Sequence, residues 1–380
     1  MAVTNQAFDL VIIGGGISGI GVAMAAIQKG YTVAVVDQQR VLQATSKNSL
    51  RIIHGGFRYL QTLNILRTRE SARAQDELLR TLPDFIKPLP CLMPLENRGL
   101  KHPIFAHAAS ILYQKLMPKG YRLPLPKVLS ADFVHEEVPI LENLSATKYL
   151  YWNDAVIQEP SYLGQYLVEQ LITKGVKFIE STVVSKVKFS NGFFQIIGES
   201  GGNEKLILAR ACVNTTGPWM QKVLVEGGFK RITHDKWAAG YNVVLNKQFE
   251  SKYAFSVQGP SGRMYFAVPR GKKTAIGTGY FRYPSDPGKV NVSELDLGKF
   301  LAGFGTALSL DAPITRADVD EVEVGVLPAT SFDGSDVTLR GRHRVSYDRG
   351  FGEILSTKYT TFLVQGRELA NQAYWHLGGA

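Results

Sequence analysis

The sequence predicts an α/β, two-domain fold in which an inserted antiparallel-sheet domain interrupts a domain of parallel strands and helices. Three observations predict it: a glycine-rich turn after an apolar N-terminal run, a proline-rich stretch between two α/β blocks, and alternating strands over 237–283. The chain has 380 residues, of which 45% are hydrophobic, and this length suffices for about two domains.

The glycine-rich turn predicts a dinucleotide site. Residues 8–13 are apolar and β-branched, as in a buried parallel strand, and 17–29 suit a helix packed on it. Between them, Gly14, Gly16 and Gly19 form a G-x-G-x-x-G motif that includes Ser18. The first glycine allows the tight turn, the second lets the backbone approach a pyrophosphate, and the third lets helix and strand pack closely. The helix N-terminus then faces the phosphates.

An acidic residue lies at the expected distance from this motif. A second strand over 32–36 ends at Asp37, where the carboxylate of such sites accepts a hydrogen bond from an adenosine ribose hydroxyl and repels a 2′-phosphate. Strand, helix, second strand and acid fall in the right order, which favours a dinucleotide site over a glycine turn of another kind. The motif alone does not separate FAD from NAD.

Composition excludes several classes of function. The net charge is +10, but Lys and Arg are scattered and no nucleic-acid-binding signature is present, so we expect no nucleic-acid partner. Cys91 and Cys212 are far apart, which excludes a disulfide framework, and no metal-ligand spacing occurs, so no metal is predicted. No apolar run reaches the ~20 residues of a membrane span, and no basic segment precedes the first strand. We therefore expect a cytoplasmic protein.

The rest of the chain falls into two α/β blocks and an insertion. Prolines recur from Pro83 to Pro139, which interrupts the first block. The second block is predicted to contain a helix over 161–173 with Ser161 as N-cap, strands over 176–180 and 206–214, a hairpin over 183–200 turning at Asn191-Gly192, a strand over 353–356 and a helix over 360–374.

A longer run identifies a family resemblance. Residues 44–60 read A-T-S-K-N-S-L-R-I-I-H-G-G-F-R-Y-L, and weaker matches follow at 214–219, 266–269, 276–278 and 358–361. These residues, in this order, resemble the FAD-dependent glycerol-3-phosphate dehydrogenases of the D-amino-acid-oxidase-like superfamily. The resemblance spans nearly the whole chain and is that of a short member, without the extra C-terminal helical domain that many of these enzymes carry.

The resemblance implies a Rossmann-like FAD-binding domain with an inserted antiparallel-sheet substrate domain over the isoalloxazine. The FAD-binding domain is expected at 1–88, 150–222 and 325–380, and the substrate domain at 89–149 and 223–324. FAD would contact the glycine motif and a further set of residues: Asp37, Thr45, Ser46, Val184, Thr216, Gly217, Lys358, Thr360 and Thr361. The helix that begins near Thr360 would aim backbone N–H groups at the flavin edge where negative charge develops.

Four departures from the family predict an altered substrate pocket. Leu327 replaces the arginine that grips the substrate phosphate in the family's G-V-R-P stretch, and Tyr241 replaces a histidine near the reacting carbon. The glycine pair before the family lysine is Ser356-Thr357, and Leu363 replaces an arginine. Losing a charge-assisted hydrogen bond of about 1.5–3 kcal/mol would weaken phosphate binding ten- to over a hundredfold unless another cation substitutes.

The candidate catalytic residues are His54, Arg58, Tyr59, Tyr241 and Lys358. In the resemblance Arg58, Tyr59 and Lys358 line the substrate pocket, and the two cations can bind a phosphate or carboxylate. The predicted reaction is the oxidation of a hydroxylated, anionic small molecule by hydride transfer to flavin N5, while His54 or Tyr241 takes the hydroxyl proton. The electron acceptor is either oxygen or a quinone.

Three alternatives remain open at this stage. The chain could be an amine or amino-acid oxidase, with Arg58 binding the carboxylate, or a non-catalytic or biosynthetic tailoring flavoprotein. The apolar stretch 104–117, flanked by Lys101, Lys115 and Lys119, could give peripheral contact with the inner face of the membrane. We favour the simpler interpretation, in which this stretch is a helix packed on the protein's own core.

Overall fold

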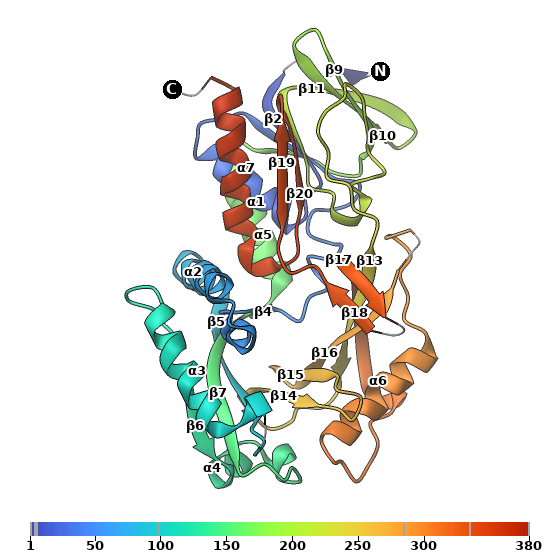
Figure 1. The fold of residues 1–380 in the computed structure, drawn as a ribbon. Coiled ribbons are helices and arrows are strands. Elements are labelled where there is room, and N and C mark those ends of the chain that lie inside the picture. The colour runs from blue at the N-terminus through green and yellow to red at the C-terminus, as the bar shows by residue number, and fades with distance from the viewer. Residues whose placement is uncertain (1, 4–6, 98, 284–285, 334–335, 379–380) are drawn as a thin grey trace.

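The computed structural model describes residues 2–3, 7–97, 99–283, 286–333 and 336–378, which form two ten-stranded sheets with helices packed around them. Figure 1 shows one sheet in the upper half of the molecule and the other in the lower half. Both ends of the chain lie at the top, beside the first sheet.

The first sheet contains the dinucleotide turn. Its main order is β12-β9-β10-β11-β2-β3-β8, with β1, β19 and β20 pairing off this path. The strands β2, β3, β8, β11 and β20 run parallel to one another where they pair, and β9 and β10 form an antiparallel hairpin. The bounds are β1 Ala2–Val3, β2 Phe8–Ile13, β3 Val33–Val36, β8 Lys177–Ile179, β9 Val183–Ser190, β10 Phe193–Ser200, β11 Asn203–Asn214, β12 Leu224–Val225, β19 Arg344–Asp348 and β20 Phe351–Leu355.

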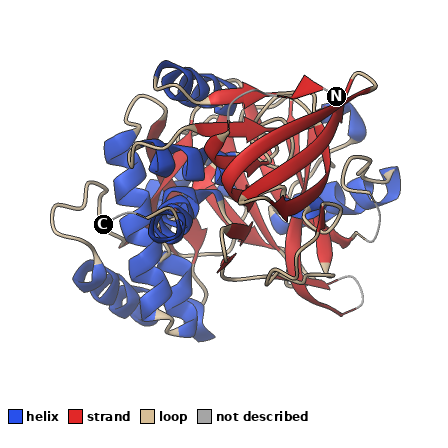
Figure 2. Ribbon diagram, turned by 90° about the horizontal axis from the view of Figure 1, so that it is seen from above, coloured by secondary structure: helices blue, strands red, loops and turns tan. Residues whose placement is uncertain are grey.

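Three helices cover this sheet, and two of them meet at glycines. They are α1 (Ile17–Ile27), α5 (Pro160–Thr173) and α7 (Phe362–His376). A Cβ on Gly366 would lie 2.2 Å from the carbonyl oxygen of Gly21, so α1 and α7 approach more closely than any side chain allows. In the view from above, helices lie beside the strands (Figure 2). This contact fixes the start of α7 next to the start of α1.

The second sheet has the order β18-β17-β13-β16-β15-β14-β5-β7-β4, with β6 paired to β7. Its pairs are antiparallel except β14 with β5. Around it lie α2 (Ile65–Thr81), α3 (Pro103–Leu116), α4 (Ala131–Glu137) and α6 (Glu294–Ala307). Its strands are β4 Ile52–Ile53, β5 Ile86–Pro94, β6 Lys127–Ser130, β7 Lys148–Ile157, β13 Trp237–Leu245, β14 Ala254–Gln258, β15 Met264–Arg270, β16 Lys273–Arg282, β17 Val319–Asp333 and β18 Asp336–Leu339.

The structure confirms most predicted elements and corrects several boundaries. Asn191 and Gly192 both have positive φ angles, 52° and 80°, as the predicted hairpin turn requires. The N-cap of α5 is Glu159 and not the predicted Ser161. Pro160 occupies the first helical position. The last helix begins at Phe362 after a 3₁₀ turn over Tyr359–Thr361.

The predicted domain boundaries at 150 and 325 are wrong for the sheets, because each cuts a strand that the second sheet keeps whole. β7 pairs with β5 from Tyr149 to Ile157, and β17 pairs with β13 from Val319 to Pro328. β4 at 52–53 also joins the second sheet. The second sheet therefore includes several segments that the prediction gave to the first domain, at 52–53, 86–88, 150–157, 325–333 and 336–339.

None of the described helices is both long and apolar enough to cross a lipid bilayer. In α3, Ala106, Ser110 and Tyr113 are buried, whereas Ile104 and Phe105 are more than half exposed. The helix therefore packs on the core along one side and presents apolar side chains along another.

Candidate active site

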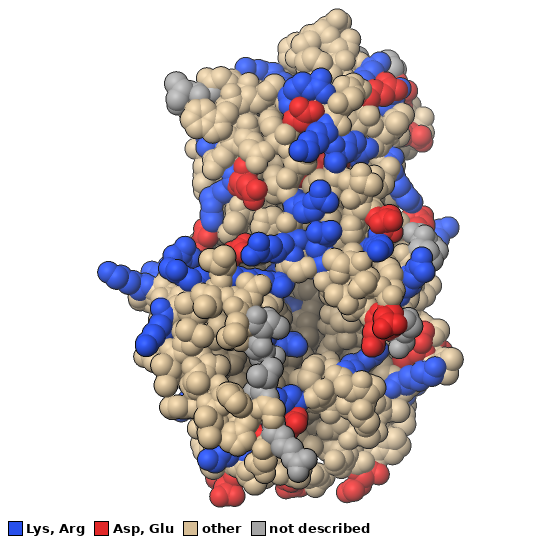
Figure 3. All heavy atoms as spheres, in the orientation of Figure 1, with Lys and Arg blue, Asp and Glu red and all other residues tan. Residues whose placement is uncertain are grey.

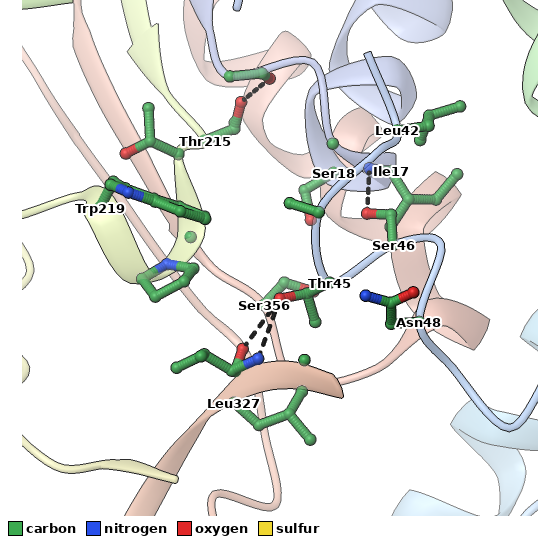
Figure 4. A pocket seen from close by; sticks show the side chains of 18 of the residues that line it. Ile17, Ser18, Leu42, Thr45, Ser46, Asn48, Thr215, Trp219, Leu327 and Ser356 are labelled. Atoms are coloured by element: carbon green, nitrogen blue, oxygen red, sulfur yellow. Dashed lines mark hydrogen bonds between the residues drawn. The ribbon is translucent and has the colours of Figure 1, made fainter. Parts of the chain in front are cut away.

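A cavity of about 690 Å³ lies between the two sheets and collects most of the predicted cofactor-binding residues. Its lining comes from the first sheet, from the segment 42–54, and from β13, β16 and β17 of the second sheet. The predicted residues that line it are Gly14, Gly16, Ser18, Asp37, Thr45, Ser46, His54, Val184, Thr216, Gly217, Lys358 and Thr360. Figure 4 shows several of them facing a common space.

The glycine turn forms a cradle with no room for side chains. Gly14 has a φ of 97°, and a Cβ there would lie 2.8 Å from the carbonyl carbon of Thr215. A Cβ on Gly19 would lie 2.0 Å from the carbonyl oxygen of Gly14. Gly19 is not among the described lining residues, so it acts through packing, which is the role its place in the motif predicts.

The acidic end of the cavity is formed by Asp37. Its Oδ2 accepts the Gly15 N–H at 2.7 Å, and its Oδ1 accepts the Gln39 N–H at 2.8 Å. Burial raises the pKa of the Asp37 carboxyl, and the two N–H groups oppose that shift. A ribose hydroxyl donating to this carboxylate would further stabilise its charged form.

Thr45 and Ser46 already have partners in the structure. Ser46 Oγ accepts the Ile17 N–H at 3.0 Å, at the start of α1. Thr45 Oγ1 accepts the Val326 N–H at 3.1 Å and lies 3.4 Å from the carbonyl oxygen of the same residue, so Thr45 ties its segment to β17 (Figure 4). Direct hydrogen bonds of both hydroxyls to a pyrophosphate or ribityl chain stay a prediction.

The ends of β11 and α7 close the cavity. Thr215 Oγ1 donates to the carbonyl oxygens of Ile13 and Gly14 at 2.9 and 2.7 Å, which joins β11 to the glycine turn (Figure 4). Thr360 is buried and lines the cavity, whereas Thr361 Oγ1 accepts a hydrogen bond from Gln365 at 2.8 Å and is not among the described lining residues.

These features fit FAD. The glycine turn packs too closely against Thr215 for side chains at Gly14 and Gly19, the N-terminus of α1 opens beside it, and Asp37 and Thr360 line the same cavity. The volume also falls in the range of about 300–1,000 Å³ that is usual for cofactor and ligand sites.

A second cavity of about 510 Å³ adjoins the first. Both cavities are lined by Leu50, His54, Thr278 and Tyr280. The second also contains two arginines, Arg58 and Arg263, and one acid, Asp336. In Figure 3 the lower half of the molecule is hollowed on this face, and Lys and Arg side chains border the hollow.

His54 lies where the cavities meet and is held by an acid that the sequence analysis missed. Its Nδ1 is 3.0 Å from Oδ2 of Asp154, whose side chain is 5% exposed. The same carboxylate accepts the Gly55 N–H at 2.8 Å and the Trp152 Nε1–H at 3.3 Å. An acceptor surrounded by donors favours the tautomer in which His54 Nδ1–H donates, and this leaves the Nε2 lone pair free.

Lys358 lies at the cavity in an unusual electrostatic environment. Its Nζ is 4.5 Å from the centre of the Tyr59 ring, and the guanidinium carbon of Arg67 is 3.9 Å from the same ring centre. Burial, together with the nearby charge of Arg67, lowers the pKa of Lys358 to about 7, while Glu70 acts in the opposite direction. Tyr59 thus lies beside Lys358, but it is not among the described residues that line either cavity, and its predicted place in the substrate pocket stays a prediction.

This environment gives a pH-dependent prediction. In the FAD-free protein, Lys358→Met should raise the free energy of unfolding by roughly 1–3 kcal/mol at about pH 6, because it removes a desolvated charge but also a cation–π contact. The lysine pKa is lower in the folded than in the unfolded chain, so the wild type gains stability as pH rises from about 7 toward 10.5, and the advantage of the variant shrinks.

Urea unfolding of the two proteins at several pH values measures this difference. Lys272→Met, at an exposed lysine in the turn before β16, is the matched control and should show no such trend. An advantage of Lys358→Met that grows with pH would contradict the prediction.

Tyr241 is not placed to act as the catalytic base. Successive side chains of a strand point to opposite faces, and on β13 it is Gly240 and Asn242 that line the first cavity. Tyr241 is buried against Phe281 and Phe300, and its Oη is 3.5 Å from the carbonyl oxygen of Asp296 in α6. Burial raises the pKa of Tyr241 to about 12, which disfavours the phenolate.

Comparisons with known proteins agree with this geometry. A family model described as FAD dependent oxidoreductase matches residues 9–355. The glycerol-3-phosphate dehydrogenase of Pseudomonas aeruginosa is 26% identical over 98% of this chain and 72% of its own length. The alpha-glycerophosphate oxidase of Streptococcus pneumoniae is 26% identical over 93% of this chain, which spans 59% of that protein's length.

Solved structures share the fold. The glycerol-3-phosphate dehydrogenase from Bacillus halodurans, complexed with FAD, superposes with a TM-score of 0.75 at 20% identity, over 98% of this chain and 66% of that one. The L-alpha-glycerophosphate oxidase from Mycoplasma pneumoniae gives a TM-score of 0.68 at 14% identity. Since the family model runs from the dinucleotide turn to β20, and the cavity fits the cofactor, this chain belongs to the FAD dependent oxidoreductase family and uses FAD.

Proposed function

We propose that this chain oxidises a hydroxylated, anionic small molecule at a CH–OH group, at the place where the two cavities meet. FAD, when bound, supplies the acceptor for the hydride that leaves the substrate carbon. The observation that carries the proposal is the position of His54, which lines both cavities and is oriented by a buried carboxylate. The similarity to proteins named glycerol-3-phosphate dehydrogenase and glycerophosphate oxidase supports a CH–OH donor.

His54 would take the hydroxyl proton. With Nδ1–H donated to Asp154, the Nε2 lone pair can accept a proton from a substrate hydroxyl, and the resulting imidazolium is stabilised by the carboxylate at 3.0 Å. Asp154 is a positioning residue here, because its three donors hold its carboxylate in one orientation. Of the two candidate bases that the sequence predicted, His54 and Tyr241, we therefore choose His54.

The apolar wall near Leu327 supports a substrate other than glycerol 3-phosphate. A Cβ on Gly240 would lie 3.1 Å from the Tyr280 ring and 3.3 Å from Leu327 Cδ1, so these side chains are neighbours on one wall. Of the other cations at the first cavity, Lys222 is paired with Asp286 and Arg51 with Glu159. Arg40 and Lys358 are then the cations of that lining that form no ion pair with an acid, among the residues that the structure describes, and Lys358 lies near the start of α7.

Anaerobic reduction of the flavin tests the proposed function. The purified holoenzyme is mixed with glycerol 3-phosphate, sugar phosphates, polyol phosphates, hydroxy acids and amino acids, and loss of the oxidised flavin absorbance is followed. We expect a hydroxylated anion to reduce the flavin at least about tenfold faster than glycerol 3-phosphate does, since one charge-assisted contact is worth at least that factor. Reduction by amino donors alone would instead indicate an amine oxidase, and reduction by none would indicate a non-catalytic role.

A further inference from the structure

We infer that the second cavity binds the anionic end of a substrate longer than glycerol 3-phosphate, and that Arg58 and Arg263 hold its terminal phosphate or carboxylate. The inference rests on the proposed function, because it places the reacting hydroxyl beside His54. It assigns a role to Arg263, which neither the motif analysis nor the resemblance singled out.

The charges of the second cavity favour an anion. Arg58 and Arg263 line it, opposed by the single carboxylate of Asp336, and among the described residues neither arginine forms an ion pair with an acid. Both guanidinium charges act on the Tyr280 hydroxyl and partly offset the effect of burial, which raises the pKa of Tyr280. The two arginines therefore lie near Tyr280, which lines both cavities.

Arg263 lies beside Tyr241. It precedes β15, and its positive charge is close enough to the Tyr241 hydroxyl to lower the pKa of that group against the effect of burial. The Tyr241 ring packs against Phe300 of α6. Tyr241 thus lies near a cation of the second cavity and not in the catalytic position that the sequence suggested.

The size of the second cavity favours a long substrate. Leu327 makes the first cavity apolar beside Tyr280, while the arginines lie in the second cavity, which Tyr280 and His54 also line. The second cavity has a volume of about 510 Å³, within the range of about 300–1,000 Å³ that holds drug-sized ligands. A molecule with its hydroxyl at His54 and its anion among the arginines therefore has room to be longer than glycerol 3-phosphate.

Binding to the holoenzyme tests this inference without requiring turnover. The probes are sorbitol 6-phosphate, gluconate, neutral sorbitol and glycerol 3-phosphate, titrated by calorimetry and by the change in the flavin spectrum. We expect one of the two long anions to bind at least about tenfold more tightly than glycerol 3-phosphate and sorbitol. Comparison of the phosphate and carboxylate probes identifies which anion the arginines prefer.

Arg263→Gln should weaken binding of that long anion roughly ten- to hundredfold, with FAD content unchanged. Tyr241→Phe keeps the ring and removes only the hydroxyl beside Arg263, so it should change binding by no more than a few-fold. Lys272→Gln removes an exposed cation from the turn after β15 and should leave binding unchanged.

The outcomes separate the two proposals. Equal affinities of Arg263→Gln and Lys272→Gln for the long anions, or no binding of either long anion to the wild type, would overturn the second-cavity site even if the flavin is reduced by another hydroxylated compound. Arginine-dependent binding without flavin reduction by any CH–OH donor would support the anion site and contradict the proposed oxidation.

Discussion

His54→Gln should slow flavin reduction by about 10²- to 10⁴-fold at saturating substrate, the usual contribution of a general base. Glutamine keeps a donor for Asp154 but has no lone pair of imidazole basicity, so the variant removes proton transfer and preserves the contact. Stopped-flow reduction of the holoenzyme by the best substrate of the panel measures the rate constant and the substrate affinity separately.

Two further variants distinguish a base from a structural residue. Asp154→Asn should also slow reduction, and the double variant should be little slower than His54→Gln alone, because both changes remove one function. His107→Gln, at an exposed histidine of α3, is the matched control and should behave like the wild type. If His54→Gln instead changes substrate affinity or FAD content while the reduction rate stays within about threefold of wild type, His54 is not the base.

The parts of the site that the sequence predicted are those set by local geometry. The G-x-G-x-x-G turn is specified by spacing within one strand, turn and helix, and the structure finds all three glycines in it crowded by backbone or side-chain atoms. Asp37 likewise follows a short strand directly. Such features need only neighbouring residues, so they can be read without knowledge of the tertiary structure.

Asp154 could not be predicted in this way. It lies on β7, 100 positions after His54, and only the pairing of β4 with β7 brings the two together. A lone aspartate within an otherwise apolar strand was the available signal: Asp154 follows Trp152 and Asn153 and precedes the apolar run 155–157. A buried, unpaired carboxylate is costly, so an acid at such a position predicts a nearby donor.

The family resemblance assigned a place in the active site to Tyr241, but the structure places its two neighbours on β13 at the cavity instead. Matching the chain to a family histidine gave position 241, whereas the pleat of β13 turns Gly240 and Asn242 toward the first cavity. Asn242 Oδ1 accepts a hydrogen bond from Thr278 at 3.0 Å on that wall. Alternation along the predicted strand would have indicated which positions share a face, but not which face the cavity lies on.

Gly19→Ala should abolish FAD binding and lower the free energy of unfolding by about 3 kcal/mol or more, through overpacking at the cofactor turn. The new Cβ would lie 2.0 Å from the Gly14 carbonyl oxygen and 2.9 Å from Thr215 Oγ1. That hydroxyl donates to Gly14 and Ile13, so the methyl group would enter the junction where β2, β11 and α1 meet. Helix α1 must then move away from β2, and the cradle for the phosphates opens.

Intrinsic propensity opposes this result, which makes the test sharp. Alanine is about 1 kcal/mol more favourable than glycine inside a helix, so only the steric contact can make Gly19→Ala destabilising. Gly298→Ala in α6 is the matched control, since its Cβ meets no heavy atom outside its own helix within 4 Å and the change should be neutral or stabilising. FAD content and thermal unfolding are measured for both variants. If Gly19→Ala retains full FAD and unfolds within about 2 °C of the wild type, α1 does not pack on β2 as closely as the structure shows.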